Sequence, residues 1–201
     1  MIKNYIFDFG NVLAEFYPDK LTAPHISDEE TNKLVREVVF DRLYWDKLDM
    51  GTITDEEVKE GIKSRVPESL KDVALTVYDN WINNLTPVKG MQKLISDMHK
   101  RGEKMYLLSN ISIGFAENYK NVKWIEELFS CFEGLVFSGV IHKVKPDEEI
   151  FKHLLGKYNL KSEECIFVDD SKINIEGAEK AGIKGYLFDG NAEKLREELG
   201  I

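Results

Sequence analysis

Residues 4–13 read NYIFDFGNVL, and they place an acidic residue directly after a short apolar run. The run Tyr5-Ile6-Phe7 has no polar alternation, which is typical of a strand that is buried on both faces of a parallel sheet. Asp8 and the Gly10-Asn11 pair that follows it predict that the strand ends there in a turn. Parallel sheets bind their ligands at the carboxyl ends of the strands, so Asp8 is the first candidate functional residue.

Four more apolar runs of the same kind recur along the chain, and helix-period segments lie between them. Alternating strands and helices predict the α/β class, with a Rossmann-like, doubly wound, mainly parallel sheet. The further strands are expected at residues 105–108, 135–137, 166–168 and 185–188, and helices at 90–101, 147–158, 173–181 and 192–199.

The region 16–85 interrupts this alternation, because it contains helical patterns and no strand candidate. The stretches 27–30 and 54–57 both have the form of a capping box, and Pro67 is expected to open another helix. We therefore expect an all-helical domain at residues 16–85, inserted into a discontinuous α/β core domain made of residues 1–15 and 86–201. Pro18 and Thr86-Pro87 mark the expected edges of the two connecting strands.

Composition narrows the possible partners. The net charge of −9 argues against binding to nucleic acid or to a membrane surface, and it leaves a small anionic ligand possible only at a locally positive site. The two cysteines are 34 positions apart and form neither a disulfide framework nor a CxxC metal motif. No apolar segment is long enough for a signal peptide or a membrane span, so a cytoplasmic location is expected. Monomer and homodimer are equally compatible with the sequence.

Polar side chains gather where the predicted strands end. Each of them has an ordinary explanation as a turn residue, but together they bring carboxylates, a hydroxyl and an ammonium to one edge of the sheet. Crowded carboxylates without histidine or cysteine favour a hard cation such as Mg²⁺, and the ammonium, the hydroxyl and backbone N–H groups suit a phosphate. These residues are Asp8, Ser109, Asn110, Lys145, Asp169 and Asp170.

The motifs resemble those of the haloacid dehalogenase-like (HAD) hydrolase superfamily, in the subfamily I branch that carries a helical cap between the first and second motifs. The resemblance covers nearly the whole chain. The four motifs are IFDFGNVL at 6–13, LLSN at 107–110, KPDEEIF at 145–151, and IFVDDS at 166–171 followed by NIEGA at 174–178.

This resemblance implies a phosphatase that acts on a small phosphorylated metabolite through an aspartyl-phosphate intermediate. Asp8 would be the nucleophile, and Ser109 and Lys145 would hold the transferring phosphoryl group. Mg²⁺ would be bound by Asp8, Asp169, Asp170 and the main-chain carbonyl of Gly10. Phe9, Gly10 and Asn110 would complete the phosphate-binding residues.

Gly10 departs from the family pattern, because phosphatases of this superfamily usually carry a second aspartate there as general acid and base. One interpretation is a phosphatase for esters with a good leaving group, and members of the branch with an Asp-x-Gly-Asn motif look like sugar-phosphate phosphatases. A second is a phosphate-binding or regulatory protein with weak turnover. A third is a metal-independent 2-haloacid dehalogenase, against which the Asp169-Asp170 pair argues. Glu15 or a carboxylate of the helical domain could also replace the missing acid.

The helical domain is expected to close over the substrate and to set specificity. Its aromatic residues Tyr44, Trp45 and Trp81 could stack on a sugar, although such residues more often pack in a core. His142 lies shortly before Lys145, at a position where relatives often have glycine. A loop histidine is usually solvated, so a substrate contact from His142 is the less favoured of its two interpretations.

Overall fold

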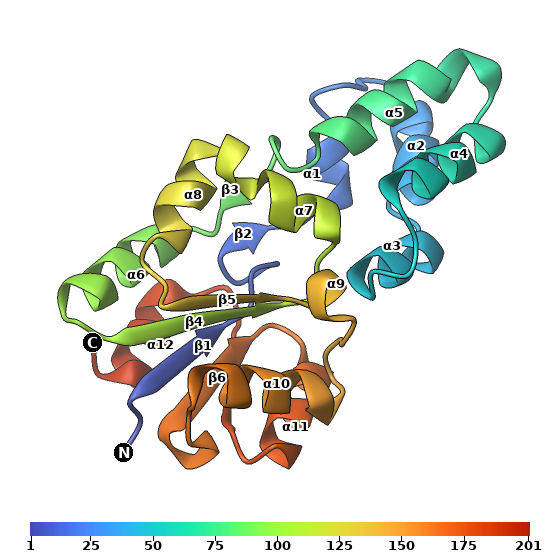
Figure 1. The fold of residues 1–201 in the computed structure, drawn as a ribbon. Coiled ribbons are helices and arrows are strands. Elements are labelled where there is room, and N and C mark those ends of the chain that lie inside the picture. Colours follow the sequence, from blue (N-terminus) through green and yellow to red (C-terminus); the bar gives the residue numbers. More distant parts are fainter.

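The computed structural model describes all 201 residues and contains a five-stranded, entirely parallel sheet (Figure 1). The spatial order β5-β4-β1-β6-β7 puts the first strand in the centre, as in a doubly wound sheet. The predicted fold class is confirmed, and all five strand candidates form strands. Their bounds are β1 Asn4–Phe7, β4 Lys104–Ser109, β5 Gly134–Phe137, β6 Cys165–Asp169 and β7 Lys184–Leu187.

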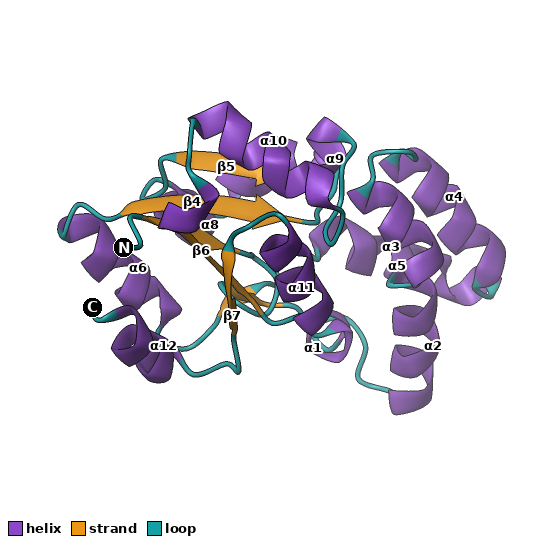
Figure 2. Ribbon diagram, turned by 90° about the horizontal axis from the view of Figure 1, so that it is seen from below, coloured by secondary structure: helices purple, strands orange, loops and turns teal.

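Helices cover both faces of this sheet. One face packs against α6 (Met91–Lys100), α8 (Lys123–Phe129) and α12 (Ala192–Leu199), and the other against α10 (Glu148–Tyr158) and α11 (Lys172–Lys180). Figure 2 shows α10 and α11 together, apart from α6 and α12. The four helices predicted for this part of the chain are therefore confirmed.

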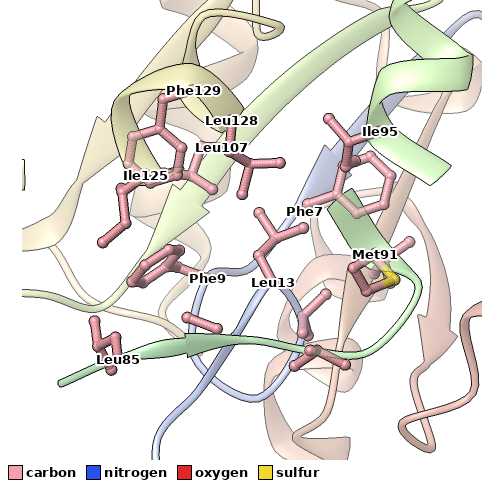
Figure 3. Close-up of a cluster of buried hydrophobic side chains, with 14 of the residues drawn as sticks. Phe7, Phe9, Leu13, Leu85, Met91, Ile95, Leu107, Ile125, Leu128 and Phe129 are labelled. Carbon is pink, nitrogen blue, oxygen red and sulfur yellow. The ribbon is translucent and has the colours of Figure 1, made fainter. Parts of the chain in front are cut away.

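Side-chain alternation along the strands divides the core into two apolar clusters. Tyr5 and Phe7 of β1 point into the larger cluster, and Ile6 between them points into the smaller one. Figure 3 shows the larger cluster, in which Phe7 lies near Ile95 and Met91 of α6, and Leu107 near Leu128 and Ile125 of α8. Burying each such side chain contributes about 1.5–3 kcal/mol, so the strands are fixed firmly enough to position the residues at their ends.

The segment 16–85 contains helices joined by turns and no strand, as predicted. It leaves and rejoins the rest of the chain through β2 (Ala14–Glu15) and β3 (Thr86–Pro87), which pair antiparallel, and it has a small apolar cluster of its own. In Figure 1 it lies beyond the carboxyl ends of the strands. Its helices are α1 Pro18–Thr22, α2 Glu29–Val39, α3 Arg42–Asp49, α4 Asp55–Arg65 and α5 Lys71–Asn80, with a 3₁₀ turn at Glu68–Leu70.

The helix caps follow the sequence closely, with one correction. Thr54 and Glu57 form the expected capping box at the start of α4. The stretch 27–30 does not form one, because Asp28 is the N-cap and accepts the backbone N–H of Thr31. A carboxylate one position later satisfies the same free N–H groups, which is why Ser27 is not needed as a cap.

The longest helices of the protein have 11 residues, and none has both the length and the apolar character that crossing a bilayer requires.

Several short helices complete the fold between the strands. The short helices are α7 Ile113–Asn118 and α9 Ser138–Ile141, with 3₁₀ turns at Tyr119–Asn121 and Ser162–Glu164.

Candidate active site

The three central strands bring their terminal polar residues together. Asp8 follows β1 directly, and its N–H donates a hydrogen bond to the carbonyl of Val168 in β6 (2.9 Å). Ser109 ends β4 and Asp169 ends β6, on either side of β1. All three side chains are buried, although each is polar, which means that they need partners or a ligand.

Lys145 is the main partner of the two buried carboxylates. Its Nζ lies 2.8 Å from Asp8 Oδ1 and 2.7 Å from Asp169 Oδ2, and its side chain is only 1% exposed. Burial lowers the pKa of Lys145, but the two carboxylates raise it further than burial lowers it. The net pKa is raised, so the ammonium is charged and provides a local positive site in a protein of net charge −9.

The backbone around Lys145 is held by a side-chain clamp. Asn110 Nδ2 donates to the carbonyl of Lys145 (2.9 Å), and the Lys145 N–H donates to Asn110 Oδ1 (2.8 Å). Gly177 of α11 packs so closely that a Cβ there would lie 2.3 Å from the carbonyl oxygen of Pro146. The side-chain amide of Asn110 is thus engaged with Lys145, and a role for Asn110 in phosphate binding stays a prediction.

The predicted acidic cluster forms, because Asp8, Asp169 and Asp170 each offer a carboxylate oxygen within 4.8 Å of the others. Burial and the charge of Asp169 raise the pKa of Asp8, against the opposing effect of Lys145. Burial and Asp169 also raise the pKa of Asp170. The three acid groups offer only oxygen ligands, and one ammonium does not neutralise all of them. A hard divalent cation would relieve the repulsion between them, so these residues fit Mg²⁺.

Asp169 differs from its two neighbours in how fully its oxygens are engaged. It accepts hydrogen bonds from the Ser171 N–H (2.8 Å) and from Asn174 Nδ2, which lies 3.1 Å from both of its oxygens. Asn174 is therefore placed to orient the Asp169 carboxylate. Asp170, in contrast, is exposed, and its only side-chain partner is Asn11 at 3.3 Å. Asp8 Oδ2 makes no hydrogen bond. The carboxylate oxygens that are free to bind a metal therefore belong mainly to Asp8 and Asp170.

A cavity of about 640 Å³ opens above this group, a size that suits a small organic ligand. Asp8, Ser109 and Lys145 line it from the sheet, together with Gly10 and Asn110. The helical segment supplies an aromatic wall whose rings pack against one another with centroids 5.1–5.9 Å apart. This wall consists of Phe16, Phe40, Trp45 and Trp81.

Phe9 and Asp170 also line this cavity, whereas Tyr44, Glu15 and His142 do not. Tyr44 stacks under Arg65, whose guanidinium carbon lies 4.4 Å from the ring centroid. Glu15 pairs with Lys20 at 2.7 Å. His142 directly follows α9, and its Nδ1 lies 3.1 Å from the carbonyl of Met50, so it joins α9 to the helical segment.

Sequence reasoning missed three charged residues that α3 brings to the cavity, namely Arg42, Asp46 and Asp49. They share one side of the helix with Trp45, since Arg42 and Asp46 are four positions apart, Trp45 and Asp49 are four apart, and Asp46 and Asp49 are three apart. That spacing could have identified these residues from the sequence. It was overlooked because charged residues on one side of a helix usually face solvent.

The fold and this site define a class of α/β proteins, which hold their reactive groups at the carboxyl edge of a doubly wound sheet. The model of the haloacid dehalogenase-like hydrolase family matches residues 2–182, and the chain belongs to this family. The predicted family and the prediction of a hydrolase are therefore confirmed.

Two of the curated relatives have lengths similar to that of this chain. The chain is 25% identical to the sesquiterpene phosphatase astK of Aspergillus oryzae, over 98% of this chain and 97% of the relative. It is 23% identical to the D-ribitol-5-phosphate phosphatase of Bacteroides thetaiotaomicron, over 100% and 98%. A crystal structure of a HAD family enzyme from the same bacterium, a magnesium complex, superimposes with a TM-score of 0.70 and 26% identity over 94% of each chain.

Proposed function

We propose that this protein is a magnesium-dependent phosphatase that hydrolyses a small phosphorylated metabolite, a sugar phosphate or a similar phosphomonoester. The carrying observation is the buried ion-paired group, in which Lys145 Nζ lies within 2.8 Å of both Asp8 and Asp169, and in which Asp8 and Lys145 line the cavity. An anionic substrate needs such a local positive charge in an acidic protein. The two phosphatase relatives and the related magnesium complex support the same reaction class.

The division into domains is part of this proposal. Residues 1–15 and 86–201 would form the core domain that carries the reactive groups, and residues 16–85 a helical cap domain. The short β2–β3 pair and the separate apolar cluster of the helical segment support this boundary. A cap that covers the cavity would exclude water and contact the leaving group.

Asp8, Asp169, Asp170 and the backbone carbonyl of Gly10 would hold Mg²⁺. When bound, the ion supplies positive charge that stabilises the crowded carboxylates and the transferring phosphoryl group. Asp169 also orients Lys145 through the 2.7 Å ion pair, and Asn174 fixes the orientation of Asp169.

Asp8 would act as the nucleophile. Its carboxylate attacks phosphorus while the bond to the leaving oxygen breaks, which gives an aspartyl phosphate and a free alcohol. Water then attacks phosphorus, releases inorganic phosphate and restores Asp8. Lys145 and Ser109 hold the phosphoryl oxygens throughout, with Phe9, Gly10 and Asn110 as further phosphate-binding residues.

Gly10 favours one alternative specifically. Glycine keeps the backbone carbonyl but removes the usual general acid and base, a contribution of ~10²–10⁴-fold to the rate. A protein that binds phosphate tightly and turns over weakly is therefore the second candidate function. The metal-independent dehalogenase is less favoured, because the Asp169-Asp170 pair would repel a carboxylate substrate.

One panel of assays separates these functions. We expect phosphate release from phosphorylated sugars, nucleotides and aryl esters that stops with EDTA, returns with Mg²⁺ and is abolished by Asp8→Asn. Phosphate binding without release would support the binding protein, and halide release without metal would support the dehalogenase. Full activity of Asp8→Asn would refute the proposed nucleophile. The absence of nucleic-acid and membrane partners, and the cytoplasmic location, stay predictions.

A further inference from the structure

We propose that Asp49, the last residue of α3, is the catalytic acid and base of this enzyme and replaces the group that position 10 lacks. The inference rests on the proposed phosphatase function, which leaves the protonation of the leaving group without a residue. It assigns that step to a side chain of the helical segment that lines the same cavity as Asp8.

Among the carboxylates that line the cavity, Asp49 alone is both partly buried and free of the acidic cluster. There are four of them, and Asp8 and Asp170 belong to the acidic cluster. Asp46 is paired with Arg42 at 3.1 Å, and its side chain is 61% exposed. Asp49 is partly buried, and its carboxyl group makes no hydrogen bond or ion pair. Glu15, another candidate for this role, does not line the cavity and is paired with Lys20.

The end of α3 is fixed to the sheet domain by backbone contacts, which gives Asp49 a defined position. Ser138 Oγ donates a 2.6 Å hydrogen bond to the Asp49 carbonyl, and His142 Nδ1 lies 3.1 Å from the next carbonyl, that of Met50. Gly51 packs so closely that a Cβ there would lie 2.2 Å from the Gly139 carbonyl oxygen. Figures 1 and 2 both show α9 beside the end of α3.

This arrangement orients a phosphomonoester between the two aspartates. The phosphoryl group must lie at Asp8 and Lys145 on the sheet side, so its organic part extends toward the helical segment. The bridging ester oxygen is the atom between these two parts. A carboxyl group on the covering helix is therefore on the correct side to protonate that oxygen as it leaves.

The electrostatic surroundings of Asp49 allow its carboxyl group to be either protonated or ionised near neutral pH. Burial raises the pKa of its carboxyl group to about 7, and the charge of Asp46 adds to this effect. Arg42 on its own helix and Lys145 on the sheet side oppose the increase, and His142, directly after the neighbouring α9, is a titratable residue in contact with this end of α3. A general acid works best when its pKa is close to the operating pH.

Asp49 gives up a proton in the first step and recovers one in the second. The Asp49 carboxyl proton moves to the bridging oxygen while the P–O bond to that oxygen breaks and the bond from Asp8 to phosphorus forms, which releases a neutral alcohol. The Asp49 carboxylate then takes a proton from the attacking water, as the water oxygen bonds to phosphorus and the bond to Asp8 breaks. Inorganic phosphate, ionised Asp8 and protonated Asp49 are the products.

The test compares two aryl esters of nearly the same shape, phenyl phosphate and para-nitrophenyl phosphate, in the intact protein with Mg²⁺. For Asp49→Asn we expect kcat on phenyl phosphate to fall by ~10²-fold or more, and kcat on para-nitrophenyl phosphate by less than ~10-fold, because nitrophenolate leaves without a proton. With phenyl phosphate, wild-type kcat/KM should fall above about pH 7 as Asp49 loses its proton. This pH dependence should disappear in Asp49→Asn.

Asp72→Asn is the matched control, because Asp72 is exposed on α5 and does not line the cavity. It should keep both rates, and circular dichroism should show that all variants are folded. Equal losses on the two esters, or no loss on either, would overturn the role of Asp49. If Asp8→Asn is inactive while Asp49→Asn retains the wild-type ratio of the two rates, the role of Asp49 is refuted and the proposed function stands. If Asp8→Asn turns over both esters as fast as wild type, the proposed function itself is refuted.

Discussion

The substitution Gly177→Ala tests how Lys145 is positioned, without changing any polar group at the site. Gly177 lies in α11, where a Cβ would come within 2.3 Å of the Pro146 carbonyl oxygen and 3.0 Å of its carbon. Both atoms belong to the backbone next to Lys145, so no flexible side chain can move aside. Ordinary contact begins near 3.4 Å, and the helix and the loop must therefore separate by about 1 Å.

Two magnitudes follow from this separation. Overpacking of this kind costs about 1–3 kcal/mol of unfolding free energy. A displacement of about 1 Å at a group that holds the reacting atoms reduces kcat by ~10²-fold. Because alanine also favours a helix over glycine by ~0.5–1 kcal/mol, the measured stability must be compared with that of another glycine-to-alanine change in a helix.

Gly156→Ala provides this comparison, since Gly156 lies in α10 and a Cβ there would meet nothing within 4 Å. Urea unfolding should show Gly177→Ala to be less stable than Gly156→Ala by about 1–3 kcal/mol. Phosphate release should fall only in Gly177→Ala. If the two variants were equally stable and equally active, close packing at Gly177 would not be what positions Lys145.

Two further substitutions test individual contacts. Asn110→Ala removes two hydrogen bonds to the Lys145 backbone, so it should lower the unfolding free energy by about 2 kcal/mol. It should also lower kcat, with a smaller effect on KM. An unchanged kcat would contradict the proposed clamp on Lys145. Asp41→Ala removes the N-cap of α3, which should cost about 1 kcal/mol at pH 7. The Leu43 N–H, then Arg65, holds the pKa of Asp41 below its ordinary value of 3.8, so this stabilisation is complete above that value and is lost as the pH falls below it. Urea unfolding curves should therefore converge for wild type and Asp41→Ala in acid, and a difference that persists there would refute the contribution of the ionised cap.

The sheet was predictable because its strands leave a strong local signal. Continuous apolar runs such as 5–7 and 166–168 mark strands that are buried on both faces, and the helix-period segments between them mark crossovers. Once these strands are parallel, their carboxyl ends must share one edge. The meeting of Asp8, Ser109 and Asp169 was therefore implied by strand order alone.

The helices at 113–129 were not predicted, although they cover part of the larger apolar cluster. Both α7 and α8 are short, and a run of one or two turns shows too few repeats for a period to be recognised. Tertiary packing, with Phe115 and Phe129 buried against the sheet, stabilises them instead.

The contribution of α3 to the cavity could not be derived from local pattern. Which face of a helix looks into a cavity depends on how the helix docks, and the docking contacts join residues far apart in sequence. Ser138 and Asp49 are 89 positions apart, and His142 and Met50 are 92 apart. The clamp of Asn110 on Lys145 could not be predicted for the same reason, since it spans 35 positions.

The most direct test of the central claim is chemical trapping of the intermediate on Asp8. The protein is mixed with para-nitrophenyl phosphate and Mg²⁺, quenched in acid within one turnover and reduced with borohydride, which converts an aspartyl phosphate to homoserine. Peptide mass spectrometry should find homoserine at position 8 only when both substrate and Mg²⁺ are present. Phosphate release at the full rate, with Asp8 unmodified at every time point and another residue reduced in its place, would contradict the account.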